Sequence, residues 1–93
     1  MCKDVQSARK ELYSALLSIK TEQEMEQFLL DLCTIKELDS MAQRILSAKL
    51  LLNGETYESI IKKTDISSAT LSRVSRCVKQ GNGYKSVLNK SID

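Results

Sequence analysis

The chain has 93 residues, 42% hydrophobic and 28% charged, enough for one globular domain with a modest core. It contains no proline, three glycines and four aromatic residues, so it lacks the turn and strand residues that sheet proteins use in numbers. It has no histidine, which removes the commonest general base, a Cys–His nucleophile and the usual zinc partner of cysteine. Composition therefore predicts an all-α protein that is not an enzyme, with no catalytic residue, metal or cofactor.

No signal for secretion or membrane insertion is present. No apolar run reaches the roughly 18 residues that span a bilayer, and residues 1–10 lack the apolar segment of a signal peptide. Three widely spaced cysteines, Cys2, Cys33 and Cys77, are typical of a reduced protein. A cytoplasmic protein without a membrane partner is expected.

Charge is distributed unevenly along the chain. Residues 1–55 carry seven basic and nine acidic side chains, a net charge of −2, whereas residues 56–93 carry seven basic and three acidic ones, a net charge of +4. A basic C-terminal part indicates a face that meets a polyanion. A solvated surface with chance asymmetry explains the charge alone equally well.

Apolar spacing and capping residues predict three helices in residues 1–54. Residues 5–19 carry an apolar stripe at helical spacing that is wide for a monomer, although an ordinary bundle helix remains open. Two Thr-x-x-Glu capping boxes, at residues 21–24 and 34–37, open the next two helices, and Gly54 closes the longer one. The inward positions of these two helices are expected to be Met25, Phe28, Leu29, Leu32, Leu38, Met41, Ala42, Ile45, Leu46, Leu50 and Leu52.

Two short helices joined by a tight turn are predicted in residues 56–80, followed by a last helix. Thr56 caps the first, which buries Ile60 and Ile61, and Ser67 caps the second. Asp65 occupies the place in the turn where φ is expected to be positive, and Ile66 should fill the corner. The remaining inward residues are expected to be Leu71, Val74 and Val78 in the second helix, and Val87 and Leu88 in the last.

This pair of helices has the plan of a DNA-binding helix-turn-helix. Small hydroxyl side chains at the start of the second helix allow a close approach to base edges, and arginines follow one turn later. Lysines nearby suit phosphate. We expect Ser67, Ser68, Ala69, Ser72 and Arg76 to face bases, and Lys62, Lys63, Thr70, Arg73 and Lys79 to contact phosphate. Taken singly, these residues also fit a helix cap and solvated arginines.

The run Ile66-Ser67-Ser68-Ala69-Thr70-Leu71-Ser72-Arg73-Val74 resembles the helix-turn-helix of the Trp repressor superfamily. The likeness extends back through Leu51-Leu52-Asn53-Gly54-Glu55, and Gly81-Asn82-Gly83-Tyr84 is similar to the Trp-repressor-related YerC/YecD group. It implies a six-helix Trp-repressor-like fold in an intertwined homodimer that binds a palindromic operator in double-stranded DNA. One domain over residues 1–93 is expected, with a dimerisation core (1–54), the helix-turn-helix (56–80) and a C-terminal helix (83–91).

The resemblance also implies an effector site. Arg44 and Arg73 match the two arginines that hold the ligand in Trp repressors, and Thr34 and Thr70 match further lining positions. Val74 stands where Trp repressors have glycine, and a β-branched side chain there fills space that a flat ring needs. Cys77 replaces a serine that helps to hold the ligand's amino group. Tryptophan is therefore not the expected corepressor, another small ligand stays open, and a salt bridge from Arg44 to Glu37 or Asp39 is the alternative.

The sequence thus predicts a dimeric transcriptional regulator, a repressor in the first instance. The alternative is a helical dimer that acts as a protein–protein interaction module, since a fold does not dictate a function. The face over residues 67–79 favours DNA, because it is rich in Ser, Arg and Lys and lacks large apolar anchors.

Overall fold

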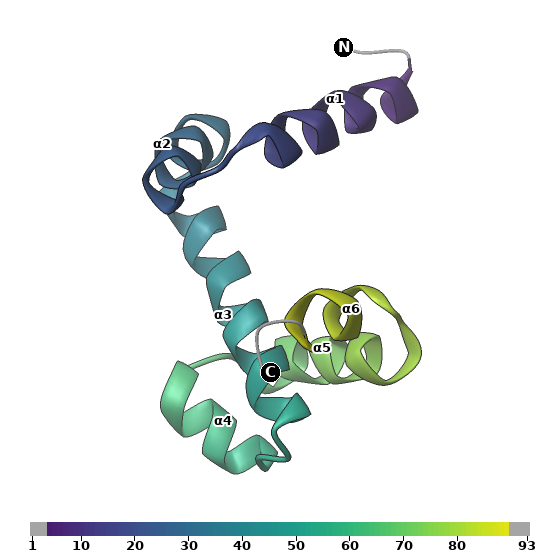
Figure 1. The fold of residues 1–93 in the computed structure, drawn as a ribbon. Coiled ribbons are helices and arrows are strands. Elements are labelled where there is room, and N and C mark those ends of the chain that lie inside the picture. The colour runs from purple at the N-terminus through teal and green to yellow at the C-terminus, as the bar shows by residue number, and fades with distance from the viewer. Residues whose placement is uncertain (1–3, 90–93) are drawn as a thin grey trace. The chain divides into compact units, whose positions relative to one another are not determined.

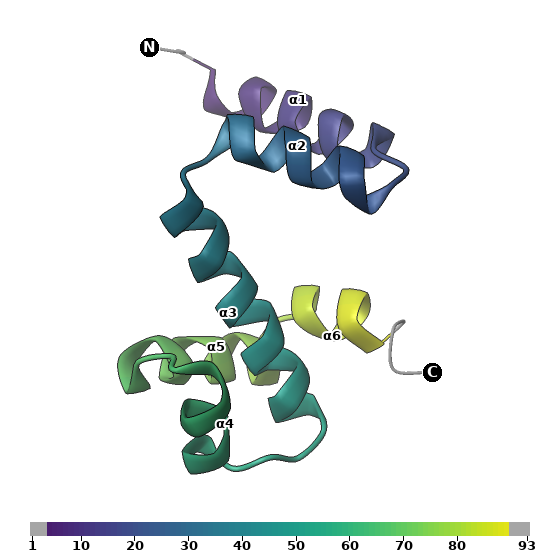
Figure 2. The ribbon, with the colours of Figure 1, turned by 90° about the vertical axis from the view of Figure 1, so that its left-hand side faces the viewer.

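The computed structural model describes residues 4–89, and every regular element in this range is a helix (Figure 1, Figure 2). In chain order these are α1 (Val5–Ser18), α2 (Glu22–Leu32), α3 (Ile35–Leu52), α4 (Tyr57–Thr64), α5 (Ser68–Gln80) and α6 (Gly83–Leu88). The all-α prediction with six helices is confirmed. Two compact units make up the chain, Met1–Leu38 and Asp39–Asp93, and each is described by itself.

Both capping boxes form in the first unit. The Thr21 hydroxyl accepts from the Glu24 N–H at 3.1 Å, and the Glu24 carboxylate accepts from the Lys20 N–H at 3.0 Å, one residue before the cap. At the start of α3 the two capping residues bind each other's backbone. The Glu37 N–H donates to Thr34 Oγ1 at 3.1 Å, and the Thr34 N–H donates to Glu37 Oε1 at 2.8 Å. The backbone N–H, followed by the hydroxyl of Thr34, lowers the pKa of Glu37 below its ordinary value.

Apolar side chains of α1, α2 and the first part of α3 stay largely uncovered. None of the residues of α1 or α2 is buried. Ile45 is 49% exposed and Leu46 is 47% exposed. The inward placement was wrong, within this chain, for Leu32, Met41, Ala42, Ile45 and Leu46. Helical spacing identifies an apolar face correctly, but it does not tell whether the same chain supplies the surface that covers it.

The second unit holds the core. Its buried apolar residues come from α3, the turn after α4, and helices α4 to α6: Ala48, Ile60, Ile66, Leu71, Val74, Val78 and Leu88. Helix α5 contacts both α4 and α6. Leu50, Leu51, Leu52, Ile61 and Tyr84 are partly buried against this cluster. The core therefore fixes the two helices of the predicted helix-turn-helix on the C-terminal part of α3.

Helix α6 buries one of the two side chains predicted to face inward. Leu88 is buried, whereas Val87 is exposed, so the inward prediction for Val87 was wrong. Consecutive helical positions differ by about 100° in direction, so the two side chains do not point the same way. Residues 90 and 91, at the end of the predicted range 83–91, lie outside the described residues. The predicted division into one domain with three parts stays a prediction.

Helix α3 ends in a Schellman motif. The Glu55 N–H donates to the Leu50 carbonyl at 3.0 Å and the Gly54 N–H donates to the Leu51 carbonyl at 3.0 Å. Gly54 has φ +86°, a left-handed conformation that favours glycine. This stop directs the chain into α4, and it places Glu55 in the connection between the two helices.

The turn between α4 and α5 has the conformation that the sequence predicts. Asp65 has φ 61° and ψ 21°, in the left-handed region, and Ile66 is 2% exposed. A contact from α3 also supports the turn, because the side-chain amide of Gln43 donates to the Thr64 carbonyl at 3.0 Å. The Thr64 hydroxyl donates to the Ile60 carbonyl at 2.8 Å and accepts from the Ile66 N–H at 3.2 Å. Each of these hydrogen bonds joins a side chain to a backbone group, so together they hold the turn between α4 and α5.

Substituting Asp65 tests the demand for a left-handed residue. Asp65→Val is expected to lower the free energy of unfolding by roughly 1–2 kcal/mol, because a β-branched side chain is strained at positive φ. Asp65→Gly and Asp65→Asn should stay close to the wild type, since both residues accept this conformation. Urea-induced unfolding followed by circular dichroism measures the differences. Equal stability of the Val and Gly variants would contradict the turn geometry.

Candidate nucleic-acid interface

Helix α5 separates a buried face from a polar one. Leu71, Val74, Ser75 and Val78 are buried, and Ser68, Ala69, Ser72, Arg73, Arg76 and Lys79 are exposed. The buried positions recur at three- and four-residue spacing, so they form one stripe that fixes the rotation of the helix. The exposed set contains six of the ten residues predicted to contact DNA, and the structure brings them together on one helix.

Two hydroxyls at the start of α5 bind each other. Ser67 Oγ accepts from the Thr70 N–H at 3.2 Å and donates to Thr70 Oγ1 at 2.9 Å. Thr70 is half-buried, in contrast to the exposed Ser68. Ser67 is therefore a helix cap first, as predicted, and the hydroxyls of Ser68 and Ser72 have no hydrogen-bond partner in the part of the chain that the structure describes.

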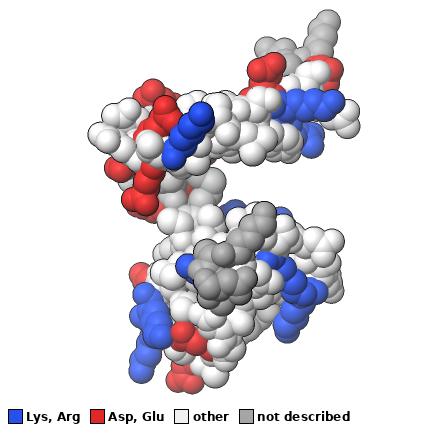
Figure 3. Space-filling model, in the orientation of Figure 1, with Lys and Arg blue, Asp and Glu red and all other residues white. Residues whose placement is uncertain are grey.

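Basic side chains of the second unit lie in separate groups on its surface, one of them over α4 (Figure 3). Lys62 on α4 and Arg73, Arg76 and Lys79 on α5 are exposed, and none of the four forms an ion pair with another described residue. Lys63 differs, because its ammonium lies 2.7 Å from Glu55 Oε1. Unpaired cations on an exposed helix are available to an anion at no cost in broken ion pairs.

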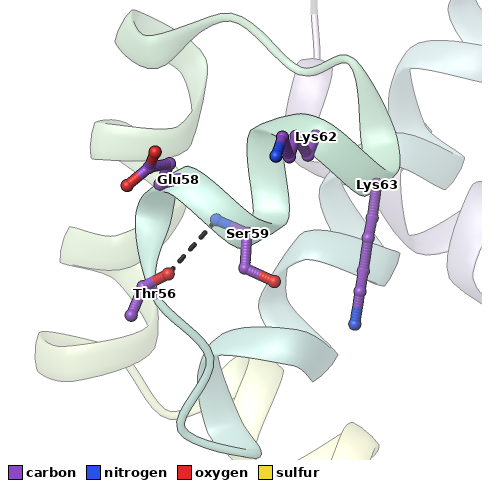
Figure 4. Close-up of a pocket in the computed structure, with 5 residues that line it drawn as sticks. All are labelled: Thr56, Glu58, Ser59, Lys62 and Lys63. Carbon is purple, nitrogen blue, oxygen red and sulfur yellow. Dashed lines mark hydrogen bonds between the residues drawn. The ribbon is translucent and has the colours of Figure 1, made fainter.

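An open depression of about 370 Å³ lies along α4 (Figure 4). Thr56, Glu58, Ser59, Lys62 and Lys63 line it. The Thr56 hydroxyl accepts from the Ser59 N–H at 3.2 Å, which confirms Thr56 as the cap of α4. Two lysines, two hydroxyl residues and one glutamate make this surface of α4 polar.

The predicted effector residues are divided between the two units. Arg44 and Arg73 are exposed, Thr70 and Cys77 are half-buried, and Thr34 lies in the other unit, where it caps α3. Val74 is 2% exposed and belongs to the core. This burial confirms the inward placement predicted for Val74 on the second helix of the pair.

The salt bridge predicted for Arg44 is not found. Within its unit, Arg44 forms no ion pair with Asp39, although both residues are described. These positions are five residues apart on α3, so they point to different sides of the helix, unlike pairs three or four apart. The carboxylate of Glu37, the other partner considered, accepts from the Thr34 N–H at 2.8 Å.

Sequence reasoning missed two polar side chains that position α4. Gln43 binds the Thr64 carbonyl, a contact between residues 21 positions apart for which the sequence carries no signal. Glu55 binds both Ser59 and Lys63. The spacing 55, 59 and 63 places the three on one side of α4 and its connection, so this network had a readable signal.

Residues 4–89 lack two other kinds of feature. No helix there combines the length and the apolar content needed to cross a bilayer. Nor does any cluster of three or more acidic or thiol side chains lie close enough together to share a metal ion in that part of the chain.

The chain is similar to proteins of known sequence and structure over most of its length. A family model described as Trp repressor protein matches residues 7–92. Protein YerC of Bacillus subtilis is 43% identical over 81 residues, which are 86% of this chain and 78% of YerC.

Two crystal structures share the fold. A Trp repressor-like protein from Staphylococcus aureus has a TM-score of 0.88 and 37% identity, covering 91% of this chain and 86% of that one. A TrpR-like protein from Eubacterium eligens has a TM-score of 0.87 and 41% identity, covering 90% of this chain and 88% of that one. The resemblance in the helix-turn-helix is thus confirmed over the whole fold, and the chain belongs to the Trp repressor family.

Proposed function

We propose that the protein is a cytoplasmic, sequence-specific transcriptional regulator that binds double-stranded DNA through α4 and α5. Membership of the Trp repressor family supports this function. The observation that carries it is the outer face of α5, where unpaired arginines and small hydroxyl residues are exposed on a helix whose other face is buried. Such a helix can enter the major groove without unfolding or exposing its core.

The proposed contacts divide into two classes. Side chains facing bases are Ser67, Ser68, Ala69, Ser72 and Arg76, and side chains contacting phosphate are Lys62, Thr70, Arg73 and Lys79. Lys63 is not in the second class, because its ammonium binds Glu55. Phosphate contacts supply affinity and register, and base contacts supply sequence preference.

We further propose that the protein is a homodimer that represses transcription from a two-fold symmetric operator. The uncovered apolar side chains of α1 to α3 support a second copy as their cover: Val5, Tyr13, Leu17, Leu30, Leu32, Ile35, Met41, Ile45 and Leu46. Two reading helices related by a dyad match half-sites about 34 Å apart along the duplex. Tryptophan is not the effector in this proposal, because a buried, β-branched Val74 stands at the position where the resemblance to Trp repressors implies glycine.

The outer face of α5 argues against a protein-interaction module. Among the described residues, none of the large exposed apolar side chains belongs to this helix. Protein hot spots favour large side chains in dry pockets, which this face does not offer.

Selection of bound sequences from a pool of random duplexes, with and without tryptophan, tests the proposal. We expect a palindromic motif that is the same in both conditions. Affinity should fall with salt, with a slope of about −0.9 for each phosphate contact on logarithmic axes. Recovery of no duplex above background, or binding that ignores salt, would overturn the proposed function.

Arg76→Ala separates base reading from general attraction. The variant should lose roughly 1–3 kcal/mol on the selected operator if Arg76 binds a guanine, and much less on random DNA. Lys79→Ala is the matched control, because a lost phosphate contact weakens binding to all sequences alike. Fluorescence anisotropy on both duplexes measures the two effects. An equal loss on both duplexes for Arg76→Ala would reassign this arginine to phosphate.

A further inference from the structure

One carboxylate in the connection between α3 and α4 holds two side chains of α4. Glu55 Oε1 accepts from the Ser59 hydroxyl at 2.8 Å and from the Lys63 ammonium at 2.7 Å. These hydrogen bonds, that of Lys63 first, lower the pKa of Glu55 below its ordinary value. Glu55 is therefore ionised at neutral pH, and its charge lies beside the basic surface of α4.

Lys63 differs from the other basic residues of the interface. Its side chain is 56% exposed, so a phosphate can reach it, but its charge is already paired. The Glu55 side chain is 25% exposed and is held by Ser59, so the carboxylate cannot easily leave. Lys62, the residue before Lys63, forms no ion pair with any described residue. The two adjacent lysines are therefore not equivalent.

We propose that Glu55 is a positioning residue that sets the phosphate affinity of the helix-turn-helix by binding Lys63 and neutralising its charge. This inference rests on the proposed function. To contact a phosphate, Lys63 must leave Glu55, and the abandoned carboxylate then lies unpaired near a polyanion. Attraction of the lysine and repulsion of the carboxylate largely cancel. The corner at α4 therefore contributes less affinity than its sequence suggests.

Glu55→Gln tests the charge while it preserves the geometry. The glutamine oxygen still accepts from Ser59, so α4 keeps its anchor, but Lys63 becomes free to bind phosphate. One additional phosphate contact steepens the salt slope by about 0.9, which raises the affinity ratio of variant to wild type about 3.5-fold between 200 and 50 mM salt. A role in folding alone would leave the slope unchanged.

A double-mutant cycle isolates the pair. In the wild-type background, Lys63→Gln should change the salt slope of DNA binding only slightly. In the Glu55→Gln background, it should abolish the whole increase in slope that Glu55→Gln causes. Glu58→Gln is the matched control. Glu58 is exposed on α4, the helix that carries Lys63, and it forms no ion pair with a described residue. This substitution removes an equal charge, and its effect should be the same with lysine or glutamine at position 63. Thermal unfolding of each variant verifies that all are folded.

Three results would overturn the inference. An unchanged or weaker salt slope for Glu55→Gln means that Lys63 does not gain a phosphate. Equal coupling of Lys63 to Glu55 and to Glu58 means that only net charge matters. Absence of DNA binding by the wild type at every salt concentration removes the proposed function and the inference with it, whereas the first two results leave the proposed function intact.

Discussion

Replacing Leu71 with alanine is expected to lower the free energy of unfolding by roughly 2–5 kcal/mol. Leu71 is 0% exposed and lies in the core between α4, α5 and α6. Truncation removes buried methyl groups and leaves a cavity in a small core that has few other contacts to compensate. Because α5 is held by this face alone, DNA affinity should fall together with the folded population. Urea-induced unfolding and operator binding at the same temperature measure both quantities.

The neighbouring Ser72→Ala variant is the control for this effect. Ser72 is exposed, so the free energy of unfolding should stay within about 0.5 kcal/mol of the wild type. If Ser72 faces bases as proposed, this variant loses operator affinity without losing stability, whereas Leu71→Ala loses both. A Leu71→Ala protein as stable as the wild type would contradict the packing described for α5.

Replacing Ile45 with glutamate is expected to dissociate the proposed dimer. Ile45 is 49% exposed in the single chain, on an α3 surface where Met41 and Leu46 are also exposed. An unpaired carboxylate buried at a dimer interface costs several kcal/mol, and about 4 kcal/mol weakens dimerisation roughly 10³-fold. Operator binding should drop to that of one half-site. Sedimentation equilibrium over a range of concentrations, with thermal unfolding at each, measures the change.

Lys36→Glu controls for the added acidic charge on α3. Lys36 is exposed and lies nine positions before Ile45, about 180° around the helix axis, so it does not share the apolar surface. This variant should keep the oligomeric state of the wild type. A wild type that sediments as a monomer at every concentration, or an Ile45→Glu protein that remains dimeric, would refute the proposed assembly.

Local chemistry was the part of this fold that could be predicted. The caps at Thr21, Thr34, Thr56 and Ser67, and the positive φ at Asp65, depend on residues within a few positions of each other. These interactions join residues that are close in the chain, so the sequence alone indicates them.

Burial was harder to predict, because it depends on what lies opposite. Val87 and Leu88 are neighbours of similar apolar character, yet only Leu88 is buried, and the sequence does not tell which of the two directions, about 100° apart, faces the core. Ser47 and Ser75 are polar by type but buried, which no periodicity of apolar residues indicates. On α3, the apolar pattern at Ile45 and Leu46 gives no information about whether the covering surface belongs to the same chain.

The sequence predicted which residues of α5 are exposed in the candidate site better than it predicted the hydrogen bonds and ion pairs around them. The exposed residues of α5 follow from the buried stripe on the same helix, so their common face could be inferred. Whether Lys63 is free, or whether Arg44 is paired, depends on side-chain positions in neighbouring segments. Gln43 and Thr64 meet only after the chain has reversed direction, and no short-range rule relates them.

The hydrogen bond from Gln43 has a practical consequence for protein engineering. A segment cut at residues 56–80 would carry both helices and the turn, but it would leave the Thr64 carbonyl without its donor. The same cut would strip Ala48 and Leu88 from the packing around Ile60 and Leu71. A transplant of this helix-turn-helix onto another scaffold therefore has to begin before Gln43 and continue past Leu88.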